Sequence, residues 1–319
     1  MTEPKGPVRQ SGLVIVDKPG GMTSHDVVAR VRRLAGTKKV GHAGTLDPMA
    51  TGVLVVGVEK ATRLLGYLTL TEKEYAATIR LGQSTSTDDA EGEITGSASA
   101  ADVSAETLHK AVAGLVGEIQ QVPPTVSAIK VGGQRAYKLT RAGAAPELQA
   151  RPVTVYEFTI TAVRREAELL DVDATVRCSS GTYIRALARD LGAALGTGGH
   201  LTRLRRTRVG GYSVQDARTL EQLADRFEVL PLAQAASAAF PRRNLTADEA
   251  RRLANGGRLA AAASTDPQAS TLPPSTLQAS TLQASTGAQA PTAAFAPDGT
   301  LIALVAEESG QARPLVVFA

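Results

Sequence analysis

A single acid stands in a rigid setting near the start of the chain. The sequence GHAGTLDPMATG covers residues 41–52, and its only carboxylate is Asp47. Its glycines allow close backbone approach, Pro48 stiffens the turn, and the apolar sequence GVLVVGV that follows predicts a buried strand. A carboxylate held firmly beside a sheet suits a nucleophile or a general base. The alternative is that Asp-Pro only marks a turn.

Two further stretches carry residue types that suit a nucleic-acid site. Tyr75, in KEYAATIRLG, is either an ordinary strand aromatic or a stacking surface for a base. Arg185 follows CSSGTY at the start of a predicted helix, whose N-terminus attracts phosphate or carboxylate. An arginine beside Asp47 would keep that acid ionised and fix its orientation. Taken alone, Arg185 also fits an ordinary surface helix.

The distribution of charge indicates an anionic partner. The net charge is only +4 at pH 7, but basic residues gather in two blocks. Residues 30–39 hold five arginines and lysines without an acid, and residues 203–208 hold four arginines. Two separated basic blocks on a nearly neutral chain are typical of a nucleic-acid footprint. A solvated helix face is the alternative for either block alone.

The composition argues against several other classes of site. One cysteine, Cys178, excludes an internal disulfide framework and argues against a cysteine zinc site. The four histidines show no ligand spacing, so no metal is expected, and a nucleotide hydrolase would need a G-x-x-x-x-G-K-[ST] loop that the chain lacks. Because there is neither a signal-peptide pattern nor an apolar run of membrane-spanning length, we expect a cytoplasmic protein with no membrane association.

The apolar spacing predicts the elements that position these residues. A strand and a turn are predicted over residues 12–21, followed by a helix that begins at Thr23 or Ser24 and ends at Gly36. Further strands are predicted at GVLVVGV, KEYAATIRLG, RPVTVYEFTITAVRR, LLDVDATVRCSS and HLTRLRRTRVGGYSV, and helices at KATRLLGYL, SAETLHKAVAGL and GTYIRALARDLGAALG. Strands interleaved with helices, without a regular βαβ period, indicate an α+β domain with a mixed, mostly antiparallel sheet over residues 10–232.

The composition changes from about residue 241. LTADEARRLANGGRL, residues 245–259, predicts one capped helix. Residues 264–293 form a low-complexity stretch with no apolar face, which predicts a disordered segment. The remaining sequence gives two apolar runs, with a turn at Pro-Asp-Gly and a polar loop between them. Residues 241–319 are therefore expected to form a small β-rich module.

Four of these stretches together carry a family resemblance: GHAGTLDPMATGVLVVGVEKATRLLGYL, KEYAATIRLGQSTSTDDAEGE, QVPPTVSAIKVGGQRAYKLTRAG and CSSGTYIRALARDLG. From about residue 11 to 232 the chain closely resembles the TruB family of bacterial tRNA pseudouridine synthases. The resemblance implies a catalytic domain of the pseudouridine synthase fold, with an RNA-gripping insertion at residues 122–150. It also implies a PUA-like RNA-binding module at the C-terminus, interrupted by the low-complexity segment. The implied activity is an isomerase that converts the T-loop uridine at position 55 of tRNA to pseudouridine without a cofactor.

The same resemblance implies roles for individual residues. Asp47 matches the catalytic aspartate, Tyr75 the tyrosine that stacks on the target uracil, and Arg185 the arginine paired with the acid. His42 matches a histidine that helps to hold the RNA near the flipped bases, and Asp89 is expected as a partner of Arg185. The other expected substrate contacts are Lys130 in a basic motif, Tyr183 beside Arg185, and the basic-block residues Arg203, Arg205 and Arg206.

The implied reaction needs only one acid. The N-glycosidic bond breaks, the uracil rotates, and its C5 bonds to C1′, so the leaving group is also the attacking group. The carboxylate either attacks the sugar, as in retaining glycoside cleavage, or removes the 2′ proton, and the sequence leaves both open. The target base must leave its stack, which requires an aromatic platform and a basic surface.

The alternative from another class is a non-catalytic tRNA-binding or folding chaperone. It would use the same basic surfaces, with Asp47 as a turn residue. A monomer is expected for either function.

Overall fold

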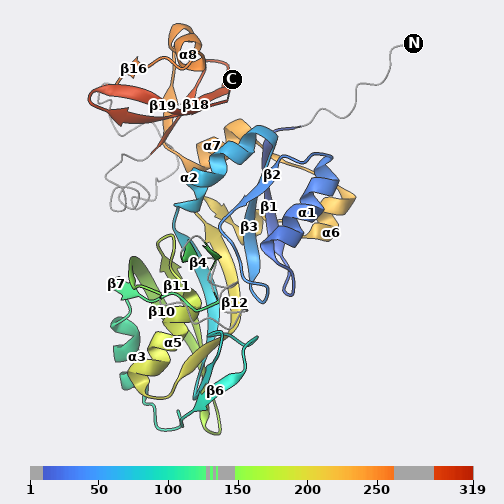
Figure 1. The fold of residues 1–319 in the computed structure, drawn as a ribbon. Coiled ribbons are helices and arrows are strands. Elements are labelled where there is room, and N and C mark those ends of the chain that lie inside the picture. Colours follow the sequence, from blue (N-terminus) through green and yellow to red (C-terminus); the bar gives the residue numbers. More distant parts are fainter. Residues whose placement is uncertain (1–9, 127–129, 132–133, 136–147, 262–290, 319) are drawn as a thin grey trace. The chain divides into compact units, whose positions relative to one another are not determined.

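The computed structural model describes residues 10–126, 130–131, 134–135, 148–261 and 291–318 (Figure 1). The segment predicted to be disordered, 264–293, lies outside the described residues except at its last three positions. The chain divides into two compact units. The first unit comprises Met1–Pro48, Gly52–Glu72 and Arg208–Ala319, and the second comprises Met49–Thr51 and Lys73–Thr207.

The N-terminal part of the first unit is a small antiparallel sheet with helices against it. Strand β1 (Gly12–Lys18) pairs with β3 (Thr51–Val58), which also pairs with β2 (Val40–Ala43). Short strand β14 (Leu230–Pro231) pairs with the start of β1. The predicted helix is confirmed as α1 (Ser24–Ala35). Its valines are buried together with those of β1 and β3 and the leucines of α6 (Leu220–Asp225).

Local signals set both ends of α1. Thr23 and Asp26 form a capping box at its start, which satisfies backbone N–H groups that have no partner inside the helix. At its end Gly36 adopts φ +60°, a left-handed conformation that glycine takes without steric cost. The arginines of this helix lie on its exposed side. The basic block at residues 30–39 therefore begins on a solvent-facing helix surface.

The C-terminal part of the first unit is a second, five-stranded sheet. Its strands are β15 (Arg242–Asn244), β16 (Leu259–Ala260), β17 (Thr292–Phe295), β18 (Leu301–Glu308) and β19 (Gln311–Val317), in the order β15-β17-β18-β19-β16. Two helices accompany it, α7 (Leu232–Ala239) and α8 (Ala247–Ala254). The turn predicted at Pro-Asp-Gly joins β17 to β18, with Gly299 at φ +82°. The expected β-rich C-terminal module is thus present, although its sheet has five strands where the sequence showed two apolar runs.

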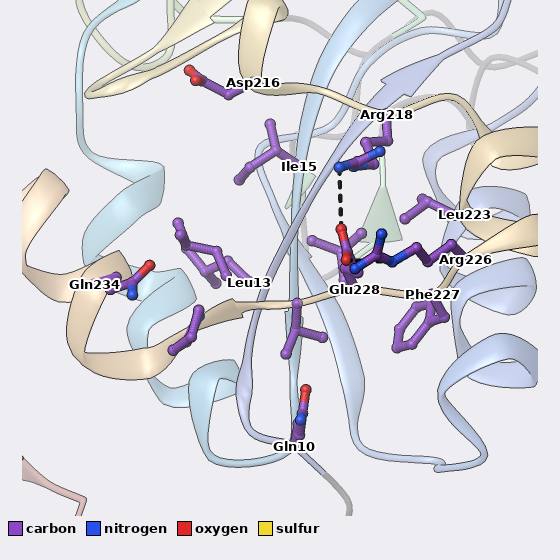
Figure 2. A pocket seen from close by; sticks show the side chains of 14 residues that line it. Gln10, Leu13, Ile15, Asp216, Arg218, Leu223, Arg226, Phe227, Glu228 and Gln234 are labelled. Atoms are coloured by element: carbon purple, nitrogen blue, oxygen red, sulfur yellow. Dashed lines mark hydrogen bonds and ion pairs between the residues drawn. The ribbon is translucent and has the colours of Figure 1, made fainter.

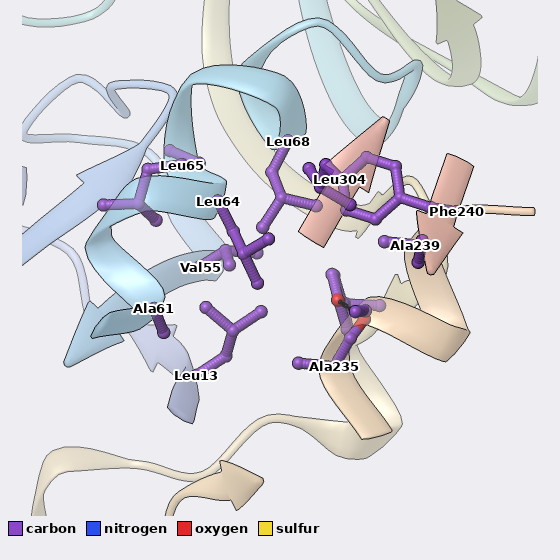
Figure 3. Close-up of a cluster of buried hydrophobic side chains, with 14 of the residues drawn as sticks. Leu13, Val55, Ala61, Leu64, Leu65, Leu68, Ala235, Ala239, Phe240 and Leu304 are labelled. Carbon is purple, nitrogen blue, oxygen red and sulfur yellow. Dashed lines mark hydrogen bonds between the residues drawn. The ribbon is translucent and has the colours of Figure 1, made fainter. Parts of the chain in front are cut away.

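One hydrophobic cluster joins the two sheets of the first unit (Figure 3). It is centred on the leucines of η1 (Glu59–Leu64) and α2 (Leu65–Thr69), the predicted short helix. Its other members include residues in or next to β1, β3, α7 and the C-terminal strands: Leu13, Val55, Ala235, Ala239, Phe240, Phe295 and Leu304. Polar contacts reinforce it, since Lys60 Nζ donates to Phe318 O and Arg63 Nη1 to Val317 O, both at 2.7 Å.

The second unit is built on five neighbouring strands of a ten-stranded sheet, in the order β12-β4-β11-β10-β7. These strands are β4 (Lys73–Leu81), β7 (Gly117–Gln121), β10 (Arg151–Glu166), β11 (Leu169–Cys178) and β12 (Gly199–Val209). β10 and β11 form the predicted antiparallel pair. Helices α3 (Ala105–Ala113) and α5 (Ile184–Leu195) lie side by side against it (Figure 1).

Strand alternation gives this sheet one apolar and one charged face. Ile79 of β4 and Val172 of β11 are buried on the first. On the second, Arg80 makes a bidentate ion pair with Asp171 at 2.8 Å, and Thr78 donates to Asp173 at 2.6 Å. The guanidinium of Arg80 holds the pKa of Asp171 below its usual value.

The remaining elements are short. They are β5 (Gln83–Thr85), β6 (Ile94–Ser97), β8 (Lys130–Val131), β9 (Gln134–Arg135), β13 (Tyr212–Ser213) and η2 (Val214–Asp216). The predicted α+β class, with a mixed and mostly antiparallel sheet flanked by helices, is confirmed. The division into units does not follow the predicted domain boundaries at 10–232 and 241–319, which stay predictions. Among the described helices none is long and apolar enough to cross a membrane.

The shared cluster makes a prediction about stability. Leu64→Ala should lower the free energy of unfolding by about 2–5 kcal/mol, because Leu64 is fully buried and its removal leaves a cavity. Leu70→Ala is the matched control: that side chain is 41% exposed, and its loss should cost within about 0.5 kcal/mol. Urea unfolding followed by circular dichroism measures both. Equal losses would contradict a core centred on η1 and α2.

Candidate active site

Asp47 lies in the loop between β2 and β3 of the first unit. Gly44 begins this loop at φ +80°, a left-handed backbone that a residue with a Cβ adopts only with strain. Asp47 itself is half-buried. Its neighbours Leu46 and Pro48 are each held by a buried side chain from the stretch DKPGGMTS, residues 17–24.

Ser24 holds the residue before Asp47. Its side chain is 1% exposed, and its Oγ accepts from Leu46 N at 2.9 Å and donates to Leu46 O at 3.1 Å. Ser24 is the first residue of α1, so the capped start of that helix fixes its position. Both backbone polar groups of Leu46 are thereby satisfied away from water.

Lys18 holds the residue after Asp47. It is the last residue of β1 and 0% exposed, and its Nζ donates to Pro19 O at 2.9 Å, Met22 O at 2.6 Å and Pro48 O at 3.1 Å. A second donor, Gly21 N, reaches Pro48 O at 2.9 Å. Burying an ammonium group is costly unless its N–H groups are hydrogen-bonded, and three carbonyl oxygens meet that requirement.

Asp47 is therefore gripped from both sides by one short stretch of sequence. Sequence reasoning missed Lys18 and Ser24 as parts of the site. The available signal was a lysine at the end of the strand sequence GLVIVDK and directly before Pro-Gly-Gly, where a flexible cation has little access to solvent.

His42 lies on β2, opposite Val56 of β3. Its ring meets that of His25 on α1 edge to face, with centroids 5.6 Å apart and an interplanar angle of 83°. The two imidazoles are in contact. In sequence, His42 lies five residues before Asp47 and His25 directly follows Ser24. The role of His42 in holding RNA stays a prediction.

In the second unit, Arg185 and Asp89 are in contact and both are buried. Arg185 lies in the first turn of α5, and its Nη1 is 3.5 Å from Asp89 Oδ2. Asp89 also accepts hydrogen bonds from Thr87 Oγ1 at 2.5 Å and Glu91 N at 3.0 Å. The guanidinium further donates to two carbonyl oxygens, Thr87 O at 2.8 Å and Val126 O at 2.9 Å.

Tyr183 occupies the N-cap position of α5, where no side chain caps the helix. Gln121, buried at the end of β7, fixes its backbone: Gln121 Oε1 accepts from Tyr183 N at 2.8 Å, and Gln121 Nε2 donates to Tyr183 O at 3.1 Å. The start of α5 therefore contacts two other segments. Gln121 joins it to the end of β7, and Arg185 joins it to the acidic turn at residues 87–89.

Tyr75 lies on β4 opposite Val176 of β11, with little of its side chain exposed. Lys73, two residues earlier, is on the same face of the strand and is also buried. Burial, together with the charge of Arg206, lowers the pKa of Lys73 to about 7. Sequence reasoning did not single out this lysine, because nothing in its local pattern marks it as buried.

The three basic-block arginines do not share one surface. Arg203 is exposed and Arg205 half-buried, and both line a cavity of about 420 Å³ together with Thr78 and Asp173. Arg206 is 1% exposed. Because successive side chains of β12 alternate between faces, Arg206 points away from Arg203 and Arg205. Arg206 therefore does not share the solvent-facing side of Arg203 and Arg205, and its role as a substrate contact stays a prediction.

Lys130 lies on β8, which pairs with β9. The expected RNA-gripping insertion, 122–150, falls mostly outside the described residues. Asp47 and His42 belong to the first unit, and the other expected site residues belong to the second. The pairing of Arg185 with Asp47 therefore stays a prediction. Within the described ranges, no three His, Cys, Asp or Glu side chains are grouped so as to hold a metal ion.

The first unit also contains a cavity of about 600 Å³ away from these residues (Figure 2). β1 and the segment leading into β14 line it, and Arg218 Nη2 lies 3.1 Å from Glu228 Oε2 at its edge. None of the expected site residues lines this cavity. It is not part of the candidate active site.

Comparison with protein families gives three matches along the chain. Residues 32–184 match the N-terminal domain of TruB family pseudouridylate synthase, and residues 185–235 match the C-terminal domain of tRNA pseudouridylate synthase B. Residues 281–319 match the C-terminal domain of tRNA pseudouridine synthase II. The three together extend from α1 to the last strand.

Individual relatives are similar over nearly their whole length. A tRNA pseudouridine synthase B of Arthrobacter sp. (strain FB24) is 61% identical over 312 residues, which are 97% of each chain. The protein of the same name from Thermobifida fusca (strain YX) is 59% identical, over 97% of this chain and 98% of its own.

Among solved structures, a chain of a Cbf5–Nop10–Gar1 complex is 26% identical, with a TM-score of 0.68 over 97% of this chain and 84% of that one. A chain of an H/ACA RNP bound to a substrate RNA containing 2′-deoxyuridine has the same fold, with a TM-score of 0.69 at 24% identity over 98% of this chain and 86% of that one. The family match and the full-length identity agree with the motifs around Asp47, Tyr75 and Arg185. The chain belongs to the TruB family of pseudouridylate synthases.

Proposed function

We propose that this chain is an isomerase that converts a uridine of tRNA to pseudouridine, with Asp47 as the catalytic acid. The type of reaction is supported by the family and by its relatives from Arthrobacter and Thermobifida fusca, which are named tRNA pseudouridine synthase B. The observation that carries the assignment to Asp47 is its mount, formed by Lys18 on one side and Ser24 on the other. A catalytic group has to be held within a fraction of an ångström of its working position, and two buried side chains supply that restraint.

The reaction has two possible courses, which differ in what the carboxylate of Asp47 does. In one course, Asp47 attacks C1′, uracil leaves with the electrons of the C1′–N1 bond, and C5 of the rotated uracil then displaces the carboxylate. In the other, Asp47 removes the 2′ proton as uracil leaves, and returns it when C5 bonds to the sugar. In both, C5 loses its proton at the end and N1 gains one, so that the product is an isomer of the substrate. No group outside the chain and the RNA takes part.

The second unit supplies the proposed contacts to the base and the backbone. Tyr75 would stack on the uracil once this base has left its stack in the RNA. Arg185, oriented by Asp89, would pair with Asp47. Arg203 and Arg205 would bind phosphates, because a guanidinium group carries a permanent positive charge and can donate two parallel hydrogen bonds to phosphate oxygens. His42, Lys130 and Tyr183 are proposed as further substrate contacts.

The finer substrate assignment rests on the family resemblance. We place the target at position 55, in the T-loop of tRNA, and assign RNA binding to the insertion at 122–150 and to a PUA-like module at 241–319. The catalytic domain of this proposal spans 10–232, and the active form is a monomer.

Replacing the acid tests the proposed reaction. Asp47→Asn should lower the rate of pseudouridine formation by more than about a hundredfold, because the amide can neither attack nor accept a proton. Its affinity for tRNA should be unchanged. Asp102→Asn, an exposed loop residue, is the matched control and should keep the wild-type rate. The assay is carbodiimide modification followed by primer extension on total tRNA, which also reports the modified position.

The outcomes separate the competing functions. If the wild-type protein binds tRNA but makes no pseudouridine, the chaperone function stands and the enzyme proposal fails. If the Asn variant retains full activity, the enzyme proposal stands without Asp47. A product at a position other than 55 would remove only the T-loop assignment.

The mount of Asp47 makes a second prediction. Ser24→Ala leaves Leu46 N and O buried without their partner, so it should cost about 1–3 kcal/mol of stability and slow the reaction about tenfold. Ser104→Ala is the stability-matched control. It removes the N-cap of α3, a loss of about 0.5–2 kcal/mol, without touching the loop of Asp47. Single-turnover kinetics with saturating enzyme measure the rates; equal rates for the two variants would show that Ser24 does not position the acid.

The two basic-block arginines on the solvent-facing side of β12 make a third prediction, about salt. Arg203→Ala and Arg205→Ala should each weaken tRNA binding and reduce the slope of log K against log salt by about 0.9, one phosphate contact apiece. Arg226→Ala is the control, since Arg226 is exposed but pairs with Glu228 in the first unit. Filter binding between low and moderate salt gives the slopes. Slopes equal to that of the wild type would remove β12 from the RNA interface.

A further inference from the structure

Helix α5 carries a second arginine one turn after Arg185. Arg189 makes three contacts: its Nη1 lies 3.2 Å from Asp88 Oδ2, its Nη2 donates to Val122 O at 2.8 Å, and its Nε donates to Asp190 Oδ1 at 2.9 Å. Its side chain is 30% exposed. Neither the family resemblance nor the proposed reaction gives Arg189 a role.

The two arginines bridge the same two segments. Arg185 joins Thr87 O and Asp89, in the acidic turn, to Val126 O. Arg189 joins Asp88, in the same turn, to Val122 O. Residues four apart lie on one face of a helix, so the two guanidinium groups form successive rungs between the turn and the segment 122–126.

The acidic turn needs this support because of its conformation. Asp88 has φ +60°, which costs a non-glycine residue on the order of 1 kcal/mol. Its backbone is fixed by hydrogen bonds from Asp88 N to Thr85 O at 3.3 Å and from Leu201 N to Asp88 O at 3.0 Å. Burial raises the pKa of its carboxyl, and the charges of Arg189 and Arg185 act against that shift. Arg189 therefore favours the ionised form of a carboxylate next to Asp89.

The segment 122–126 is held to α5 at both ends. Gln121 bonds to the backbone of Tyr183, Val122 O accepts from Arg189, and Val126 O accepts from Arg185. Prolines at 123 and 124 supply no backbone N–H, so the carbonyl oxygens of Val122 and Val126 are important contacts of the segment. Loss of Arg189 would release Val122 O and the Asp88 carboxylate, and would leave Arg185 to join the acidic turn to the segment 122–126.

We propose that Arg189 is a positioning residue for the isomerisation: it keeps the acidic turn and the segment 122–126 in register, so that Arg185 holds its contact with Asp89. This proposal rests on the proposed function, in which Arg185 pairs with the catalytic acid. Arg189 touches neither the substrate nor Asp47 in this role. It acts through Arg185.

A purely stabilising ion pair is the competing explanation. Partly exposed pairs contribute little to stability, and their loss changes the folding free energy without a specific effect on the chemical step. The two explanations predict different rates of the chemical step in folded protein with RNA bound: a positioning residue slows that step when it is lost, and a stabilising ion pair does not. They also predict different results for the double variant, because rate losses at Arg185 and Arg189 add only if the two residues act independently.

The experiment compares five variants of the full chain under single-turnover conditions, with tRNA affinity and thermal midpoint measured on the same samples. Arg189→Gln and Asp88→Asn should each slow pseudouridine formation about tenfold, because misplacement of a positioning network by a fraction of an ångström has effects of that order. Asparagine tolerates the left-handed conformation as aspartate does, so Asp88→Asn removes only the charge. Asp190→Asn, which removes the partner within the helix, is the control and should stay at the wild-type rate.

Additivity provides the decisive comparison. In Arg185→Lys protein, which keeps the charge but not the fork of contacts, adding Arg189→Gln should cause no further fall in rate, since Arg189 acts through Arg185. The proposal is overturned if Arg189→Gln alone keeps the wild-type rate, or if its loss adds in full to that of Arg185→Lys. Failure of the proposed function looks different: the wild-type protein itself would then form no pseudouridine.

Discussion

The buried ammonium group of Lys18 is the interaction on which the candidate site depends. It lies where β1 ends, and it draws three backbone carbonyls to one point, two from the turn that follows and one from the residue after Asp47. A cation without water must find such partners, so the positions of the turn and of the Asp47 loop are coupled through it. The same turn leads into α1, whose first residue, Ser24, reaches back to the other side of the acid. One continuous stretch, from strand to helix, thus grips a loop that is more than twenty residues away in sequence.

This arrangement is consistent with a reaction that asks for one acid and for accuracy. A base that leaves the sugar by nitrogen and returns by carbon supplies its own second nucleophile. The protein has then to hold the carboxylate, the base and the RNA backbone in place. In the second unit the arginines of α5 do comparable work, since each ties the acidic turn to the segment after β7. In both units the polar side chains that position the site bond mainly to backbone carbonyls, which are fixed by the strands and helices around them.

The sequence predicted the elements well and the buried polar contacts poorly. Alternation and helical spacing marked β4, β10, β11, α1 and α5, because each of these elements buries one regular face. The short strands β2, β14 and β16 escaped notice, since they are too short to show a period and form by pairing with longer strands. The division into units follows contacts among distant segments, and no local pattern reports those.

Single residues show the same limit. Asp47 and Arg185 stood out through their motifs, whereas Lys18 and Ser24 looked like ordinary strand-end and capping residues until their partners were seen. Arg206 shows the reverse: a cluster of arginines suggested one basic surface, although strand alternation alone would have placed one of them on the opposite face.

The most direct test of this account is the rate of the chemical step in Lys18→Met. Methionine fills much of the same space but donates no hydrogen bond, so the Asp47 loop loses its central tie. With tRNA saturating and the folded state verified by circular dichroism, pseudouridine formation should slow at least about tenfold while tRNA affinity stays at the wild-type value. A folded Lys18→Met protein that isomerises bound tRNA at the wild-type rate would contradict the claim that this buried cation positions the catalytic acid.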